Sequence, residues 1–196
     1  LQPVVAQLDG AGDRPEGGRA ARQGFWIALG VSLPFVLILL SGEVLLRWME
    51  VDATIIPTAV EYMDALAWGA PGICMVLFLR FFSEGSGNTR PTMYLGLMGI
   101  AFNVPLNYIL MFGKLGMPAL GAQGCGYATS IVMWLQALMM FSYVRSNYRY
   151  QGFELFEHWD WPYWPAIQRL LRIGLPIGGT IFVEGSLFVA AALLIA

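Results

Sequence analysis

Long apolar segments alternate with short polar ones along most of the chain. The apolar segments cover residues 24–46, 59–82, 92–112, 120–144 and 173–196. Each segment has about 20 residues or more, the length at which an α-helix crosses the hydrocarbon core of a bilayer. The pattern therefore predicts an all-α fold, a polytopic transmembrane helix bundle.

The polar connections differ in character. Residues 9–23 combine Gly, Pro and charges, and predict a short polar loop. Residues 83–91, SEGSGNTRP, predict a turn that ends with Pro91 in the first turn of the next helix. The glycine-rich residues 113–126 predict a turn into a closely packed helix. Residues 165–173 have the pattern of a short amphipathic helix on the membrane surface, ahead of the last segment.

Composition agrees with a membrane protein. Hydrophobic residues make up 57% of the 196 residues and charged residues only 12%, against roughly 25% charged in soluble domains. The net charge of −2 gives no information about partners, and no nucleic-acid partner is expected. Cys74 and Cys125 lie in apolar segments without Cys or His at ligand spacing, so they are predicted to be buried free thiols.

Positive charge is unevenly distributed between alternate connections. One alternate set, at 9–23, 80–91 and 145–172, holds nine of the eleven Lys and Arg residues, and the other set holds only Arg47 and Lys114. Because loops rich in Lys and Arg remain in the cytoplasm, the first set is predicted to be cytoplasmic.

Glu184 is the ionisable residue of the last apolar segment. A carboxylate near mid-membrane costs about 2 to 3 kcal/mol on insertion scales, so it needs an internal partner, a proton or a bound cation. Two interpretations remain open: a functional acid, or a glutamate hydrogen-bonded to a neighbouring helix for packing alone.

Asn103 and Asn107 form a second polar feature, in the sequence NVPLN. The spacing of four residues places both amides on one helical face. Pro105 between them frees a backbone carbonyl at a similar depth. A polar binding notch and a packing contact between helices are both compatible with this pattern.

Prolines inside apolar segments predict helix kinks at Pro34, Pro71, Pro105 and Pro176. Enzyme chemistry is not expected, because no cluster of His, Cys or acidic residues has the spacing of a metal or catalytic site. A purely structural membrane subunit remains compatible with composition alone.

Four stretches carry a family resemblance. They are PVVAQLDGAGD at 3–13, RFFSEGSGNTRPTM at 80–93, NVPLNYILMFGKLGMPALGAQGCGYATSIV at 103–132 and RLLRIGLPIGGTIFVEGSLFVAAALLIA at 169–196. Together they resemble the multidrug and toxic compound extrusion (MATE) family, in its NorM-type bacterial branch. The resemblance extends over essentially the whole chain.

The resemblance implies twelve membrane helices in two six-helix lobes, of which this chain would run from the end of helix 2 into helix 7. Residues 1–146 would then be a partial N-terminal lobe, 147–172 a cytoplasmic linker between lobes with the amphipathic helix, and 173–196 the start of the C-terminal lobe. The chain is accordingly expected to be a piece of a longer protein, with the missing C-terminal lobe as its partner.

The resemblance also implies a function. Family members are secondary antiporters of the bacterial inner membrane that export organic cations in exchange for Na⁺ or H⁺ by alternating access. Glu184 matches a glutamate that binds the coupling cation, which makes it a possible Na⁺ ligand, and Asn103 and Asn107 match a polar pocket of the first lobe. No cofactor beyond the coupling ion is implied, and the implied partners besides the missing lobe are organic cations and membrane lipid. A lipid-linked oligosaccharide flippase of the same superfamily is the alternative.

Overall fold

The computed structural model describes residues 1–195, apart from the side chains of 181 and 188–195, so Ala196 at the end of the last predicted segment lies outside the described residues. The elements are α1 (Gln2–Gly10), α2 (Arg14–Leu40), α3 (Gly42–Trp48), α4 (Ile56–Ala67), α5 (Ala70–Gly85), α6 (Arg90–Phe112), α7 (Gly121–Ser146), the 3₁₀ helix η1 (Tyr148–Phe153) and α8 (Trp164–Ile195). No strand occurs in this range. The predicted all-α class is confirmed.

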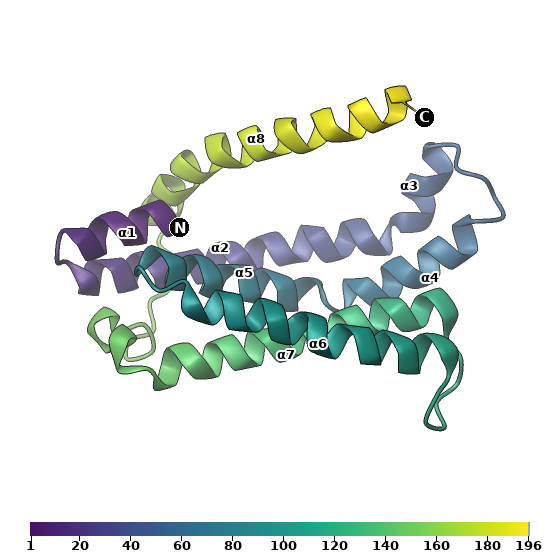
Figure 1. The fold of residues 1–196 in the computed structure, drawn as a ribbon. Helices are drawn as coiled ribbons and strands as arrows, with labels where there is room; N and C mark the ends of the chain where they lie inside the picture. Colours follow the sequence, from purple (N-terminus) through teal and green to yellow (C-terminus); the bar gives the residue numbers. More distant parts are fainter. Residues whose placement is uncertain (196) are drawn as a thin grey trace.

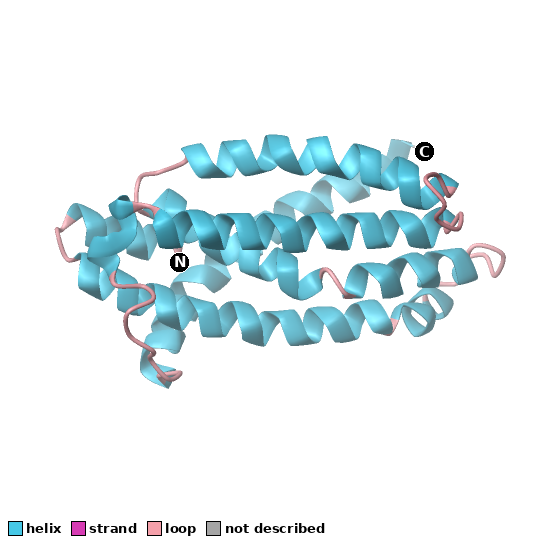
Figure 2. Ribbon diagram, turned by 90° about the horizontal axis from the view of Figure 1, so that it is seen from below, coloured by secondary structure: helices cyan, strands magenta, loops and turns pink. Residues whose placement is uncertain are grey.

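The long helices run side by side in one elongated bundle (Figures 1 and 2). α7 packs against α4, α5 and α6, while α2 packs against α5 and α1. Four helices are long and apolar enough to cross a membrane, or five if α4 and α5 form one bent span. This agrees with the five predicted apolar segments. The α1–α2 turn, the α5–α6 turn and η1 share one end of the bundle (Figure 1), and we call this the arginine-rich end.

The start of α2 corrects the first predicted loop. Helix α2 begins at Arg14, so most of residues 9–23 is helical. The carboxylate of Asp13 accepts a hydrogen bond from the backbone N–H of Glu16 at 3.2 Å, and Glu16 itself lies in the first turn. A side-chain cap and an acidic first turn both stabilise a helix start. The apolar pattern missed this part of the helix because its residues are polar.

The second apolar segment is a broken span. The chain bends by 49° between α4 and α5, and Pro71 lies in the first turn of α5. The break falls at Trp68 and Gly69, just before Pro71, and a kink caused by Pro71 stays a prediction. Pro34, Pro105 and Pro176 lie inside α2, α6 and α8, which continue through them, so a kink at those positions stays a prediction.

Side chains of α7 satisfy the carbonyl groups that the break leaves free. The hydroxyl of Ser130 donates to the carbonyl oxygen of Ala65 at 2.7 Å, and the indole N–H of Trp134 donates to that of Trp68 at 2.9 Å. A Cβ on Gly69 would lie 2.8 Å from the Cα of Ser130. Small residues thus bring α7 close enough to replace the lost helical hydrogen bonds.

The glycine-rich connection before α7 behaves as predicted. Gly113 ends α6 in the left-handed conformation, with φ of 65°, which glycine adopts at little cost. A Cβ on Gly124 would lie 2.5 Å from the carbonyl oxygen of Leu110, and one on Gly126 would lie 2.7 Å from the Cβ of Ala65. The small residues at the start of α7 therefore let it approach both α6 and α4.

The main buried core lies at the arginine-rich end. Phe82 of α5, Met140 of α7 and Phe153 of η1 are almost wholly buried in it. Elsewhere large apolar side chains remain exposed, such as Leu33 at 67% and Leu97 at 60%. Such a surface suits helices whose outer faces meet lipid rather than water.

Helix α8 corrects the last two predicted elements. Residues 165–173 and the final segment form one continuous helix that begins at Trp164. Leu170 is buried, whereas Arg169 and Arg172 are exposed, as the amphipathic pattern predicts. The boundary expected at residue 173 therefore lies inside a helix, because a helix propagates through polar and apolar faces alike once it has nucleated.

Candidate functional site

Asn103 and Asn107 lie on the same face of α6, as their spacing predicts. The side-chain N–H₂ of Asn107 donates to the side-chain oxygen of Asn103 at 2.8 Å and to its backbone carbonyl at 2.9 Å. Both residues are partly buried, and the side-chain oxygen of Asn107 is buried without a hydrogen-bond partner in the described structure. A buried acceptor without a donor is costly, so the asparagine pair leaves one acceptor unused.

Gln136 is a second polar residue of the bundle that sequence reasoning missed. Its side-chain N–H₂ donates to the backbone carbonyl of Leu95 at 2.8 Å and joins α7 to α6. The side chain fits because Gly99 of α6 leaves room where a Cβ would clash with it. The available signal was a polar residue in one apolar segment and a glycine in another. Only the folded structure shows that Gln136 and Gly99 face each other.

Glu184 lies far along α8, and its side chain is exposed. Within the described residues it makes no hydrogen bond or ion pair. Helix α8 packs against α2, and its second half extends away from α6 in Figure 1. The chain therefore does not bring Glu184 to the asparagine pair.

Metal-ligating side chains do not cluster in the described part of the chain. Among the described residues, no group of three or more His, Cys, Asp or Glu side chains could hold a metal ion. Cys74 and Cys125 are free and partly buried. As a Na⁺ ligand, Glu184 would need oxygens from other segments, because hard cations take several oxygen ligands.

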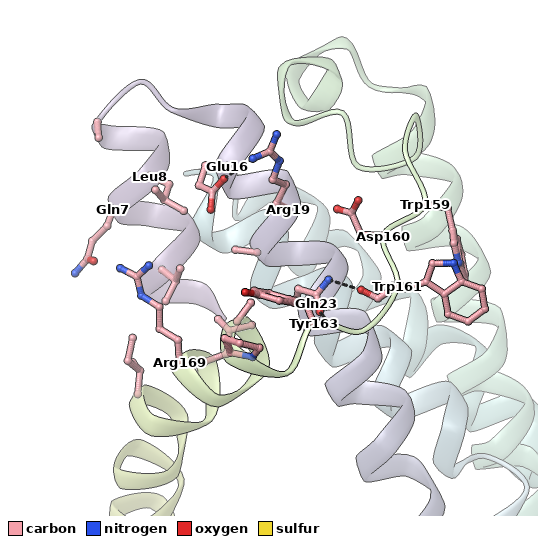
Figure 3. A pocket seen from close by; sticks show the side chains of 17 residues that line it. Gln7, Leu8, Glu16, Arg19, Gln23, Trp159, Asp160, Trp161, Tyr163 and Arg169 are labelled. Atoms are coloured by element: carbon pink, nitrogen blue, oxygen red, sulfur yellow. Dashed lines mark hydrogen bonds and ion pairs between the residues drawn. The ribbon is translucent and has the colours of Figure 1, made fainter.

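A pocket of about 1040 Å³ opens at the arginine-rich end, between α1, α2, the residues before α8 and the start of α8 (Figure 3). Gln7, Glu16 and Arg19 line one side, and Tyr163 and Arg169 line the other. Glu16 and Arg19 pair with each other at 3.3 Å. No sequence pattern predicted this pocket, because its walls are far apart along the chain.

The residues that connect η1 to α8 are fastened to α2. Arg22, which is only 9% exposed, pairs with the carboxylate of Asp160 at 2.6 Å and donates to the carbonyl of Glu154 at 2.7 Å. The indole N–H of Trp26 donates to the carbonyl of Asp160 at 2.9 Å. A buried guanidinium with two such partners is satisfied, so this contact holds the connection in place.

Gln23, buried beside Arg22 on α2, completes the attachment. Its side-chain N–H₂ donates to the carbonyl of Trp161 at 3.0 Å (Figure 3). Its side-chain oxygen accepts from the backbone N–H of Tyr163 at 2.8 Å. One amide thus binds the backbone on both sides of Pro162. We call the contacts of Arg22, Gln23 and Trp26 with residues 154–163 the linker clamp.

Helix η1 is anchored by buried hydrogen bonds. The hydroxyl of Tyr150 lies 2.7 Å from that of Ser83 and accepts from the side-chain N–H₂ of Asn88 at 3.0 Å. Burial raises the pKa of the Tyr150 phenol above its ordinary value. Phe153 packs on Gly17, where a Cβ would lie 3.0 Å from its ring. Residues 147–163 are therefore part of the packed bundle rather than a free loop.

Comparison with known proteins identifies the family. A family model described as MatE matches residues 1–109. The chain belongs to the MatE family. The resemblance to multidrug and toxic compound extrusion proteins found in the sequence is thereby confirmed.

Curated relatives agree along the whole chain. The "Multidrug resistance protein MdtK" of Yersinia pestis (strain Pestoides F) is 40% identical over 196 residues, which is 100% of this chain and 43% of that protein. The protein of the same name from Yersinia enterocolitica serotype O:8 is 41% identical over the same extent. This chain thus spans less than half the length of these relatives, whose names describe multidrug resistance proteins rather than enzymes.

Solved structures share the fold. The MATE transporter NorM-NG, solved in a complex with a monobody, is 32% identical, with a TM-score of 0.75, over 100% of this chain and 43% of that one. An inward-facing multidrug resistance MATE family transporter aligns with a TM-score of 0.77 at 23% identity, over 88% of this chain and 38% of that one. The protein is therefore a multi-pass membrane protein with part of the MATE helix bundle.

Proposed function

We propose that this chain is the greater part of the first lobe, with the first helix of the second, of a secondary antiporter that exports organic cations in exchange for Na⁺ or H⁺ by alternating access. The observation that carries this proposal is identity of 40% to multidrug resistance proteins over the entire chain. The protein would lie in the bacterial inner membrane with its arginine-rich end in the cytoplasm, as the distribution of positive charge favours.

Glu184 is proposed to bind the coupling ion. It lies on a helix of membrane-spanning length and has no partner among the described residues. A carboxylate at membrane depth is stable only with a proton, a cation or an internal donor. Because Na⁺ or H⁺ and an organic cation would compete for this one negative charge, entry of the ion would favour release of the substrate.

Asn103 and Asn107 are proposed to line the polar pocket of the first lobe. The partnerless side-chain oxygen of Asn107 supports this role, since it offers an acceptor to a substrate or to a water molecule. Tyr108 and Phe112 on the same helix have ring centroids 5.5 Å apart. Aromatic faces of this kind attract organic cations.

The test is ion-driven efflux of a cationic dye from vesicles that contain the full-length transporter. Glu184→Gln keeps the size of the side chain and removes its charge, and we expect it to abolish acceleration of efflux by a Na⁺ or H⁺ gradient. Glu157→Gln, at an exposed position of the connection before α8, is the matched control and should retain it. Gradient-driven efflux of wild-type rate in Glu184→Gln would remove Glu184 from the mechanism.

A further inference from the structure

The connection between the lobes is rigid where it meets α2. Arg22 and Gln23 hold residues 154–163 at the carboxylate of Asp160 and at backbone groups on both sides of Pro162. The proline ring also fixes its own backbone angle and restricts the residue before it. A hinge in this connection would have to break several partly buried polar contacts together.

Tyr163 joins the clamped connection to α8 through its backbone hydrogen bonds. Its backbone N–H donates to Gln23 at 2.8 Å, while its carbonyl accepts from the backbone N–H groups of Ala166 and Ile167, each at 3.1 Å. The same residue therefore ends the linker clamp and caps the helix. Helix α8 also packs against α2, with Leu170 7% exposed. The first turns of α8 are thus joined to the first lobe.

The next stretch of α8 is rich in glycine and contains a proline. A Cβ on Gly174, Gly178 or Gly179 would meet nothing within 4 Å. Pro176 between them cannot donate to the carbonyl of Arg172, which a residue of any other type would do. Proline and glycine are the usual causes of helix bending. Residues 174–179 are therefore the first stretch after the clamp whose composition favours a bend.

We propose that the pivot between the two lobes is the segment 174–179 within α8, and that Arg22 and Gln23 are positioning residues that make the chain up to Ile173 a part of the first lobe. The inference rests on the proposed two-lobe transport function. It places the pivot at the base of the helix that carries Glu184 rather than in the polar connection before that helix. Bending at 174–179 would then tilt Glu184 relative to the first lobe while the linker clamp stays closed.

Distances between spin labels in the full-length transporter test the pivot directly. One label replaces Thr89 in the first lobe, and the second replaces exposed Glu157, Arg172 or Phe182 in turn. The samples are compared with and without the lipophilic cation tetraphenylphosphonium, at low and high Na⁺ concentration and at two pH values. The account predicts constant distances from 89 to 157 and to 172, and a changed distance from 89 to 182.

The outcomes separate the two proposals. A change in the distance from 89 to 157 or to 172 would place the pivot before residue 174 and overturn this inference. Constancy of all three distances, together with absence of dye efflux, would instead contradict the proposed transport function. Constancy of all three distances in a protein that transports would also overturn the pivot.

Variants give a second test. Gly178→Ala combined with Gly179→Ala stiffens the helix, and we expect transport to slow about tenfold because alanine favours the straight helix at both positions, with unchanged affinity for tetraphenylphosphonium. Gly96→Ala in α6, where a Cβ also meets open space, is the matched control and should transport normally. A wild-type transport rate in the double variant would overturn the pivot.

Discussion

At the scale of single residues, the close approach of the η1 backbone to α2 requires glycine at position 18. A Cβ on Gly18 would overlap the backbone carbonyl of Phe153, which cannot move aside as a flexible side chain would. We expect Gly18→Ala to lower the free energy of unfolding by about 1 to 3 kcal/mol. Gly10→Ala, whose Cβ meets nothing within 4 Å, is the control. Equal thermal stability of the two purified full-length variants would refute this packing.

The raised pKa of Tyr150 predicts that the stability of the protein falls at alkaline pH. Because burial raises its pKa in the folded protein above the ordinary value of 10.0, the folded state holds the phenol proton more tightly than the unfolded chain does. The stability contributed is fully present below pH 10 and is lost as pH rises through the raised pKa. Tyr150→Phe should remove this part of the alkaline loss in melting temperature. Tyr148→Phe, at an 82% exposed site, should keep it; the same alkaline slope in both variants would contradict the assignment.

Residues differ in how far the sequence reveals them. The asparagine pair could be predicted, because a spacing of four residues fixes a shared helical face without tertiary information. The role of Arg22 could not, because its partner Asp160 lies 138 residues further along the chain. Gln23 and Gln136 were missed for the same reason: their partners are backbone carbonyls of other elements, which no side-chain pattern marks.

At the scale of elements, the broken span depends on α7. Ser130 donates its hydroxyl to the carbonyl of Ala65 just before the bend. Ser130→Ala leaves that buried carbonyl unpaired, and we expect a loss of about 1 kcal/mol of stability. Ser142→Ala is the control, because Ser142 donates to its own helix at an exposed position. Thermal unfolding of both variants measures the difference. Equal losses of stability would show that the hydroxyl of Ser130 does not stabilise the bend.

Element boundaries were predictable where a backbone rule decides them. Pro71 and Pro91 each lie in the first turn of a helix, the helical position that proline favours. The start of α2 and the continuity of α8 were not predictable from hydropathy, because each helix extends from the membrane into a polar region. Tertiary contacts stabilise the polar part in both cases, because the start of α2 packs against η1 and the start of α8 packs against α2.

At the scale of the whole molecule, the distribution of arginine predicts the orientation. Thr89 lies at the arginine-rich end, while Lys114 lies at the opposite end, after α6. In otherwise cysteine-free full-length protein, we expect Thr89→Cys to react with a membrane-impermeant thiol reagent only from the cytoplasmic side, and Lys114→Cys only from the outside. The reverse labelling pattern in intact cells and inverted vesicles would invert the proposed orientation.

The sequence predicted the class of the whole molecule well, because the lengths of apolar segments define a membrane bundle. It could not assemble the ion site that we propose. Glu184 and the asparagine pair lie on helices that this chain leaves apart, so a site that combined them would have to include other segments.

The most direct test of the proposed antiport is gradient-driven transport by the purified full-length protein in liposomes. Efflux of a fluorescent organic cation is followed while an opposing gradient of Na⁺ or of H⁺ is imposed and then collapsed with an ionophore. We expect uphill movement of the dye with one of the two gradients and its loss on collapse. Dye movement that never exceeds equilibration, whichever gradient is imposed, would contradict it.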